Sequence, residues 1–237
     1  MIIQHTAQRK LTVLLTFSPP LARTTIWIVI LLPMLFSSCS GGLKKEYWEN
    51  GKLKSEVSMN GALYEGPATW YYPNGNIQTN CSYHLNLLHG KMTRYFEDGK
   101  KQLEALYVEG KKNGVQVTWN EEGRMISRFS YSMDSLNGPF QEWHPNGRIK
   151  IKGAYRNGKY QGEWNYFNED GMIVGKGVFN NGDGLQKAFY EDGSLRMEVP
   201  YLLNRKNGIE TWYDIQGKTE KINEYKNGKM ISSSTFK

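Results

Sequence analysis

The sequence is poor in proline, in cysteine and in long apolar runs. Eight prolines among 237 residues exclude a collagen-like chain. The apolar stretch Ile26–Phe36 has 11 residues, whereas a membrane-spanning helix needs about 20, so a polytopic membrane protein is excluded. Two cysteines, Cys39 and Cys81, are too few for the disulfide framework of a small secreted domain, although a single bond between them stays an alternative.

Tyrosine and glycine are abundant instead, with 15 and 25 residues, and aromatic residues make up 13% of the chain. This composition favours short β-strands joined by tight turns over packed helices. The formal charge is +7, but Arg9, Lys10 and Arg23 lie in the first 38 residues and leave a surplus of +4 for the rest. So small a surplus predicts no nucleic-acid partner, because nucleic-acid-binding domains carry a clustered basic surface.

The N-terminus has the pattern of an export signal. Arg23 precedes the apolar run, whose length suits the hydrophobic region of a signal peptide. The Ser37-Ser38-Cys39-Ser40 segment that follows resembles the lipobox of bacterial lipoproteins, in which cleavage before the cysteine exposes that residue to acylation. We therefore expect residues 1–38 to be a cleaved signal peptide and Cys39 to be lipidated, with residues 39–43 forming a flexible tether. An ordinary secretory signal and an uncleaved apolar anchor are the alternatives.

A tandem repeat fills residues 44–230. Its turn glycines are 24 residues apart, with one gap of 22, and they are Gly51, Gly75, Gly99, Gly123, Gly147, Gly171, Gly193 and Gly217. Four residues before each glycine stands an aromatic residue, and we predict that these residues form the repeat core: Tyr47, Tyr71, Tyr95, Trp119, Trp143, Phe167, Phe189 and Tyr213. A fixed period of this length is the signature of a repeat architecture.

Each unit is predicted to be a two-stranded β-hairpin. Segments such as Pro73–Gly75 and Glu97–Gly99 are typical of a type I turn with a glycine bulge. The strand after the turn alternates with period two, which places residues two, four, six and eight after the glycine on one apolar face. The predicted fold is therefore all-β, an elongated single-sheet antiparallel meander of about eight tandem hairpins, with residues 231–237 as a C-terminal tail. Because the sixth unit lacks two residues before Gly184, we expect a tighter turn there.

These units resemble the MORN repeat family in its bacterial 24-residue form. The stretch His89–Lys100 carries the family's pattern of a glycine, an aromatic pair and a closing Gly-Lys, and Tyr155–Trp164 is similar. The resemblance covers about residues 44–230. It implies an extended β-sheet that acts as an interaction or membrane-associated scaffold, and some bacterial members are labelled antitoxins.

No motif indicates catalysis, a metal or a cofactor. His84, His89 and His144 lack metal-ligand spacing. Paired acids before the turn glycines, such as Glu97-Asp98, are explained better by turn formation than by calcium binding. Phosphate loops, nucleophile elbows and zinc signatures are missing from the sequence. We therefore predict a non-enzymatic protein that needs no metal or cofactor.

Four further aromatic residues form a candidate binding surface: Trp70, Trp164, Tyr166 and Trp212. The alternation of strand side chains places them on the face opposite the repeat aromatics, where a carbohydrate or a peptide could stack on them. Cross-strand packing of large side chains is the alternative, and we favour it. Cys81 falls on the apolar face of its strand and is expected to be a small buried residue.

Together these patterns predict a lipid-anchored exported protein of the bacterial cell envelope, attached to the outer membrane, whose sheet binds another protein. A glycan-binding module that uses the surface aromatics is one alternative. A binding partner of a toxin, of the antitoxin type, is another. An apolar face on a one-layer sheet also favours the pairing of two copies into a homodimer.

Overall fold

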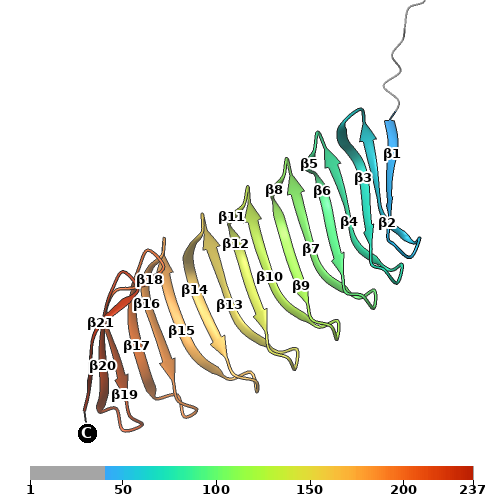
Figure 1. The fold of residues 1–237 in the computed structure, drawn as a ribbon. Helices are drawn as coiled ribbons and strands as arrows, with labels where there is room; N and C mark the ends of the chain where they lie inside the picture. The colour runs from blue at the N-terminus through green and yellow to red at the C-terminus, as the bar shows by residue number, and fades with distance from the viewer. Residues whose placement is uncertain (1–40, 237) are drawn as a thin grey trace, which may run out of the picture. The chain divides into compact units, whose positions relative to one another are not determined.

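The computed structural model describes residues 41–236, which form one open antiparallel sheet of 21 strands. Each strand pairs with its neighbours in sequence, so the strands lie side by side in chain order (Figure 1). The strands are β1 (Gly41–Tyr47), β2 (Leu53–Asn60), β3 (Leu63–Tyr71), β4 (Ile77–His84), β5 (Leu87–Leu88), β6 (Gly90–Tyr95), β7 (Lys101–Val108), β8 (Lys111–Lys112), β9 (Gly114–Trp119), β10 (Met125–Ser132), β11 (Ser135–Leu136), β12 (Gly138–Trp143), β13 (Ile149–Arg156), β14 (Lys159–Phe167), β15 (Ile173–Asn180), β16 (Asp183–Phe189), β17 (Leu195–Leu202), β18 (Arg205–Lys206), β19 (Gly208–Tyr213), β20 (Thr219–Lys226) and β21 (Lys229–Thr235). The predicted all-β meander is confirmed.

The sheet is seventeen strands wide. Four of the strands, β5, β8, β11 and β18, have two residues each and continue into the next strand across a one-residue interruption. Sixteen strands make the eight predicted hairpins, and β21 adds one more. In the part of the chain that the structure describes, no helix is long and apolar enough to cross a membrane.

The sheet extends beyond the predicted repeat boundaries at both ends. Gly41 and Gly42, which we assigned to a flexible tether, lie in β1 and pair with Asn60 and Met59. Most of the predicted tail, residues 231–237, lies in β21, which pairs with β20 from Lys226 to Lys221. The reason is that each terminal segment can satisfy its backbone hydrogen bonds on the free edge of the neighbouring strand. The proposed lipidation site, Cys39, lies outside the described residues.

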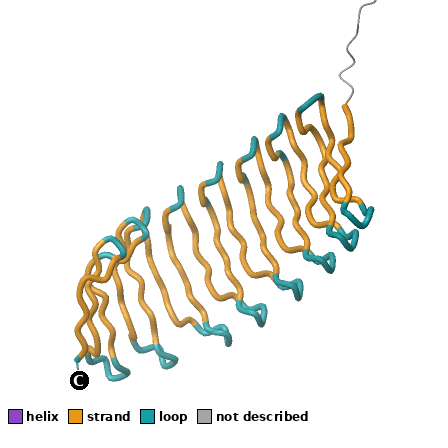
Figure 2. The backbone as a smooth tube through the Cα atoms, viewed as in Figure 1, coloured by secondary structure: helices purple, strands orange, loops and turns teal. Residues whose placement is uncertain are grey.

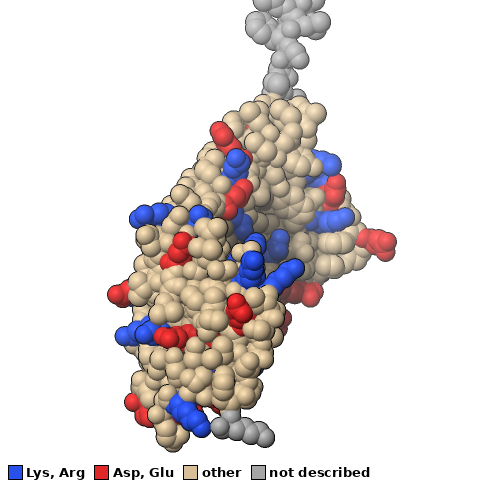
Figure 3. All heavy atoms as spheres, turned by 90° about the vertical axis from the view of Figure 1, so that its left-hand side faces the viewer, with Lys and Arg blue, Asp and Glu red and all other residues tan. Residues whose placement is uncertain are grey.

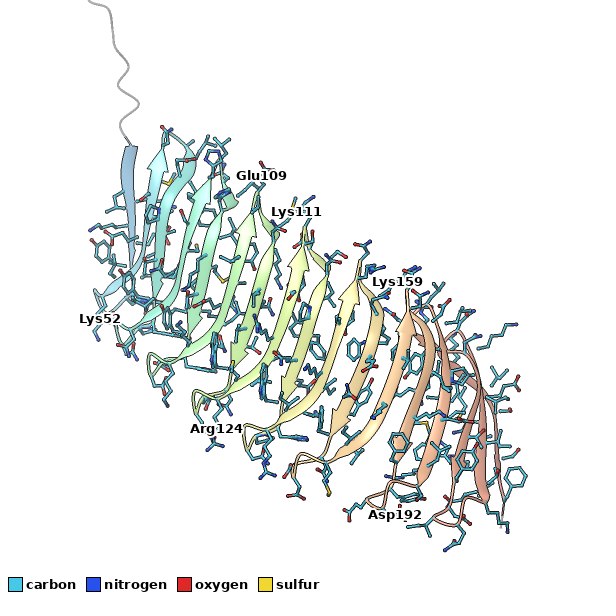
Figure 4. All side chains as sticks on the ribbon, turned by 180° about the vertical axis from the view of Figure 1, so that it is seen from behind. Lys52, Glu109, Lys111, Arg124, Lys159 and Asp192 are labelled. Carbon is cyan, nitrogen blue, oxygen red and sulfur yellow. The ribbon has the colours of Figure 1, made fainter. Side chains whose placement is uncertain are left out.

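The turns form two rows, one along each edge of the sheet (Figure 2). Glycine at the turn position is needed because φ is positive there, as at Gly75 with φ 98°. Seven of the eight turns at the opposite edge contain two residues that both have positive φ, such as Asn157 and Gly158, which is the type I′ geometry. Lys52, Arg124 and Asp192 mark the first edge, and Glu109, Lys111 and Lys159 the second (Figure 4).

The prediction of a tighter turn in the sixth unit is wrong. Asn181 and Gly182 form the same two-residue turn as in the other units, with φ of 54° and 90°. The two missing residues are those of the bulge that interrupts the pairing of β13 with β14 between Lys152 and Ala154. The pairing of β15 with β16 is uninterrupted as a result.

A second bulge follows each turn glycine and decides which residues share a face. Trp70 pairs with Thr79, but its neighbour Tyr71 pairs with Ile77, so Gln78 is an extra residue. The residue two after the glycine therefore joins the side of the sheet that carries the repeat aromatics. Lys101 in this position places its ammonium 5.7 Å from the ring centre of Trp119. We predicted that the residues two, four, six and eight after the turn glycine share one face. This prediction is wrong for the residue two after the glycine, which lies on the other face.

We call the side with positions four, six and eight after the turn glycine the core face, and the other side the reverse face. The most buried line of the core face joins the residue six after each glycine to the residue seven before the next, and it contains Val57, Ala68, Cys81, Ala105, Gln116, Phe140, Trp164, Val199, Glu210 and Asn223. Side chains of one layer bury each other here, because each hairpin alone is too small to form a core. The predicted burial of Cys81 is confirmed.

Candidate functional site

The four candidate aromatic residues all lie on the core face, but they differ in exposure. Trp164 is 3% exposed, and its ring centre lies 5.1 Å from that of Tyr155 and 4.7 Å from that of Tyr160. Gly153 makes this possible, because a Cβ there would lie 2.3 Å from the indole. Trp164 is therefore a core residue, and its place in the candidate binding surface is corrected.

Trp70 is half-buried and packs against the aromatic cluster near β4. Its ring centre is 6.3 Å from that of Tyr83. Together with Cys81 and Met92 it lines a shallow hollow of about 220 Å³. This arrangement is the cross-strand packing that the sequence analysis favoured as the alternative to ligand binding.

Tyr166 lines a larger hollow in the core face, with a volume of about 800 Å³. Its floor consists of Gly175 and Ala188, which pair directly across β15 and β16 and have little or no side chain. The same position as Ala188 carries Trp70 and Trp212 in other units. The hollow thus exists because this unit has alanine where every other unit has a larger side chain, which is an indole in two of them.

Arg196 and Tyr190 close the hollow on the side away from Tyr166. The guanidinium of Arg196 lies 5.7 Å from the ring centre of Tyr190 and 5.6 Å from that of Trp212. Trp212 does not line the hollow itself but holds Arg196 at its rim by a cation–π contact. Tyr166 and Trp212, which are 46 residues apart in sequence, are thereby brought to one site.

The hollow combines rings with charges of both signs. Burial raises the pKa of Tyr166, so its hydroxyl stays protonated. The hydroxyl and the backbone N–H of Ser194 hydrogen-bond to Asp192 and lower the pKa of its carboxyl, so Asp192 is ionised at the rim. Within the described residues Arg196 has no ion-pair partner within 4 Å. Glu191 also lines the hollow, so two carboxylates stand there against one guanidinium. The site can therefore accept a flat or apolar group, with Arg196 as the one cation that an anion on it could pair with.

The repeat aromatics, which we predicted to form the repeat core, lie on the reverse face instead, and none is fully buried. Tyr47 is 61% exposed, and the other seven are half-buried. The backbone carbonyls of four of them, Tyr71, Tyr95, Phe167 and Tyr213, have a partner that the sequence did not reveal, the side chain three residues before the turn glycine of the preceding unit. Trp48 Nε1 donates to Tyr71 O at 3.1 Å, and Tyr72 Oη donates to Tyr95 O at 2.8 Å. His144 Nε2 does the same to Phe167 O at 2.8 Å, so His144 is a structural donor.

A buried polar cluster near the C-terminus was also missed. The Glu210 side chain accepts hydrogen bonds from Trp212 Nε1 and Asn223 Nδ2 at 3.0 and 2.6 Å and is ion-paired with Lys206. Burial alone would raise the pKa of Glu210, but these three donors outweigh it and lower the pKa. Glu210 and Asn223 stand on the most buried line of the core face, where most units have apolar residues. Only the pairing of β19 with β20 shows that these two polar side chains face each other.

The remaining candidate ligands are dispersed. His84 is paired with Glu65 at 2.8 Å at the far edge of the sheet. Among residues 41–236, no three His, Cys, Asp or Glu side chains gather in a group that could hold a metal ion. The paired acids lie in the turns, where Asp98 accepts a hydrogen bond from the backbone N–H of Lys100 at 3.0 Å. This bond is the turn-forming role that the sequence analysis favoured.

Five segments of the sequence match the family described as MORN repeat variant, namely residues 41–60, 64–84, 88–109, 136–159 and 182–202. They make up 108 of the 237 residues, and each contains two strands of one hairpin. The three hairpins around Gly123, Gly171 and Gly217 fall outside these segments, yet they pair in the same way.

Among solved structures, the chain is similar to one in the crystal structure of TcdB2-TccC3-Cdc42. The sequences are 12% identical, and the match covers 81% of this chain but 12% of the other, with a TM-score of 0.19. A likeness this weak carries no argument about fold or function. No curated protein matches the sequence.

Proposed function

We propose that this chain is a MORN repeat protein that acts as a non-enzymatic scaffold and binds another protein through the core face of its sheet. The five matching segments and the uniform pairing of all eight hairpins support the family assignment. The observation that carries the binding function is the hollow between Tyr166 and Arg196. Tyrosine and arginine are among the residues that dominate binding energy at protein interfaces, and here Tyr166, Tyr190 and Arg196 line a hollow in the core face.

Filling the hollow tests this proposal. An indole at residue 188 would occupy the space above Gly175, and the repeat already accommodates Trp70 and Trp212 in the equivalent positions. We therefore expect Ala188→Trp to fold normally and to lose its partner. Val178→Trp is the matched control, because Val178 is 65% exposed and lies on the reverse face.

The assay is cross-linking of the tagged full chain in its own membranes, followed by affinity capture and mass spectrometry. We expect one dominant protein with the wild type and with Val178→Trp, and its loss with Ala188→Trp. Equal capture by all three proteins would refute binding at the hollow.

We further propose that the protein is exported and attached to the bacterial outer membrane through a lipid on Cys39. The basic residue, apolar run and small residues before Cys39 support this proposal. Cys39→Ala should abolish incorporation of labelled palmitate. Cys81→Ala is the control, since Cys81 is buried in β4 and should leave labelling unchanged. Labelling that survives Cys39→Ala would exclude the anchor.

A glycan ligand is the second candidate for the same hollow. Tyr166 and Tyr190 offer ring faces for stacking, and Asn168 and Asp192 offer polar groups for hydroxyls. This alternative predicts that no protein is captured and that Ala188→Trp abolishes retention on an immobilised cell-wall polysaccharide. Ile209→Trp, at an exposed position on the reverse face in β19, should leave that retention unchanged.

A further inference from the structure

A line of basic side chains crosses the reverse face of the sheet. Arg128 on β10, Lys152 on β13 and Lys176 on β15 each stand five residues after a turn glycine. Cross-strand pairing joins them into one continuous row, which we call the basic row: Arg128, Gln141, Lys152, Asn165, Lys176 and Lys187. Two amides alternate with the first three cations, and no acidic residue interrupts the row.

The cations of the basic row are mostly without counter-charges. Arg128, Lys152 and Lys176 are exposed, and within the described residues none of them has a carboxylate within 4 Å. Only Lys187 approaches one, Glu198, at 3.8 Å. By contrast, Glu104 further along the same line is neutralised by Lys91 and Lys101 at 2.8 and 2.9 Å.

Other charges near the row are few. Glu163 is an exposed carboxylate on the adjacent line, where it pairs with Val178 and makes no ion pair within 4 Å among residues 41–236. Figure 3 shows several Lys and Arg side chains near the middle of the face that it presents, with others around its outline among Asp and Glu. The small net charge of the chain therefore conceals a local concentration of positive charge.

The row is linear and regularly spaced. Arg128, Lys152 and Lys176 are two strands apart from one another, which corresponds to about 10 Å per step at a strand spacing of roughly 4.8 Å. The row is one residue wide. Ser130, Ala154 and Val178 flank it on one side, and the repeat aromatics Trp143, Phe167 and Phe189 lie on the same face on the other side.

We propose that the basic row binds a linear acidic polysaccharide that carries about one carboxylate for every two sugar units. The lysines and the arginine would pair with successive carboxylates, the amides of Gln141 and Asn165 would bond to hydroxyls, and the aromatic rings would contact the sugar rings. This surface is separate from the hollow, so the proposal stands or falls independently of the proposed function.

The geometry fits other polyanions less well. A DNA strand carries a phosphate about every 3.4 Å along the helix axis, which is much denser than the cations here. A membrane presents a two-dimensional array of headgroups, whereas the row offers a single file of charges bordered by uncharged residues. Charge spacing and shape therefore favour a chain of sugars.

The test is binding of fluorescent hyaluronate oligosaccharides to the full chain, compared with dextran, a thymidine oligonucleotide, and phosphatidylglycerol vesicles. The variant replaces all three exposed cations: Arg128→Gln, Lys152→Gln and Lys176→Gln. The control makes the same charge change at the turn edge marked by Lys111 in Figure 4, with Lys111→Gln, Arg156→Gln and Lys229→Gln. Thermal melts of both variants establish that each is folded.

We expect hyaluronate to bind in preference to the other three probes. The row variant should raise its Kd about tenfold, which is the effect of losing three exposed ion pairs, and the control should change it less than about twofold. An equal loss of hyaluronate affinity in both variants would show that binding depends only on net charge, and this result would overturn the proposal. Absence of hyaluronate binding, or tighter binding of the oligonucleotide or the vesicles, would overturn it as well.

Discussion

Replacing Gly153 with alanine tests the packing of the core face. Gly153 lies in β13, pairs with Phe140 and does not have a positive φ, so alanine introduces no backbone strain. Its Cβ, however, would lie 2.3, 2.5 and 2.6 Å from Cδ2, Cε2 and Cε3 of Trp164. Carbon atoms in contact are normally about 3.5–4.0 Å apart, so the indole must move by more than 1 Å or so.

The indole has little room to move. Its ring centre is 5.5 Å from that of Phe140, 5.1 Å from that of Tyr155 and 4.7 Å from that of Tyr160. Overpacking of such a site costs roughly 1–3 kcal/mol. Alanine recovers roughly 0.5–1 kcal/mol because it restricts the unfolded chain more than glycine does. Because the added Cβ would overlap three ring atoms at once, the cost should lie at the upper end of that range, and we expect Gly153→Ala to lower the free energy of unfolding by about 2 kcal/mol.

Urea denaturation followed by tryptophan fluorescence measures this change. Gly42→Ala is the control, because nothing lies within 4 Å of its added Cβ and its φ is not positive, so its stability should stay level or rise slightly. Trp164→Leu in the Gly153→Ala background should recover about 1 kcal/mol relative to the sum of the two single changes. If Gly153→Ala is as stable as the wild type, the inference that Trp164 is seated on the glycine backbone is refuted.

Four further predictions concern buried polar groups. Glu210→Ala should destabilise the C-terminal repeats by about 3 kcal/mol in urea, because Lys206 and Asn223 lose their partner, whereas Glu210→Gln should cost less. The folded-state pKa of Glu210 is lowered, so its stabilising contribution is present above the unfolded value of 4.5 and should disappear in melts as the pH falls through the folded value. Burial raises the pKa of Tyr83 and Tyr155 from 10.0 to about 12. The stability that these phenols contribute below pH 10 should therefore be lost as the pH rises from 10 to 12, which circular dichroism can follow. Unchanged stability over that range would contradict their burial. Burial also raises the pKa of the Cys81 thiol. In the Cys39→Ala variant, Cys81 should therefore react with a thiol reagent only after denaturation. Rapid reaction of the native protein would show that the Cys81 side chain in β4 is accessible.

The architecture could be predicted from the sequence because its determinants are local. Positive φ at residues such as Gly75 requires glycine, and the 24-residue period repeats that requirement along the chain. Alternation between the turns then allows little besides an antiparallel meander. The same reasoning identified Cys81 as buried, since it stands at a repeated position on the apolar side of its strand.

The composition of the two faces depended on pairing that no single hairpin reveals. One extra residue follows each turn, such as Gln78, and it moves the residue before it, Ile77, from the core face to the reverse face. The two-residue deletion before Gly184 likewise removes a bulge and leaves the turn unchanged. Alternation within a strand does not predict bulges, because they arise from hydrogen bonding to the neighbouring strand.

Burial likewise depended on neighbours in adjacent units. Trp164 is buried because Gly153 on one flanking strand leaves room for its ring and Gly177 on the other leaves room for Phe179, whose ring centre lies 6.4 Å from that of Trp164. Tyr166 lines a hollow because Gly175 and Ala188 leave space unfilled. The basic row follows the same logic, since Arg128, Lys152 and Lys176 are 24 residues apart in sequence but lie in one file across the sheet. The sequence alone determined the repeat, its turns and its sheet; the tertiary structure decided which side chains fill the core and which remain free to bind, because in a one-layer sheet burial is set by the size of the residues on the strands to either side.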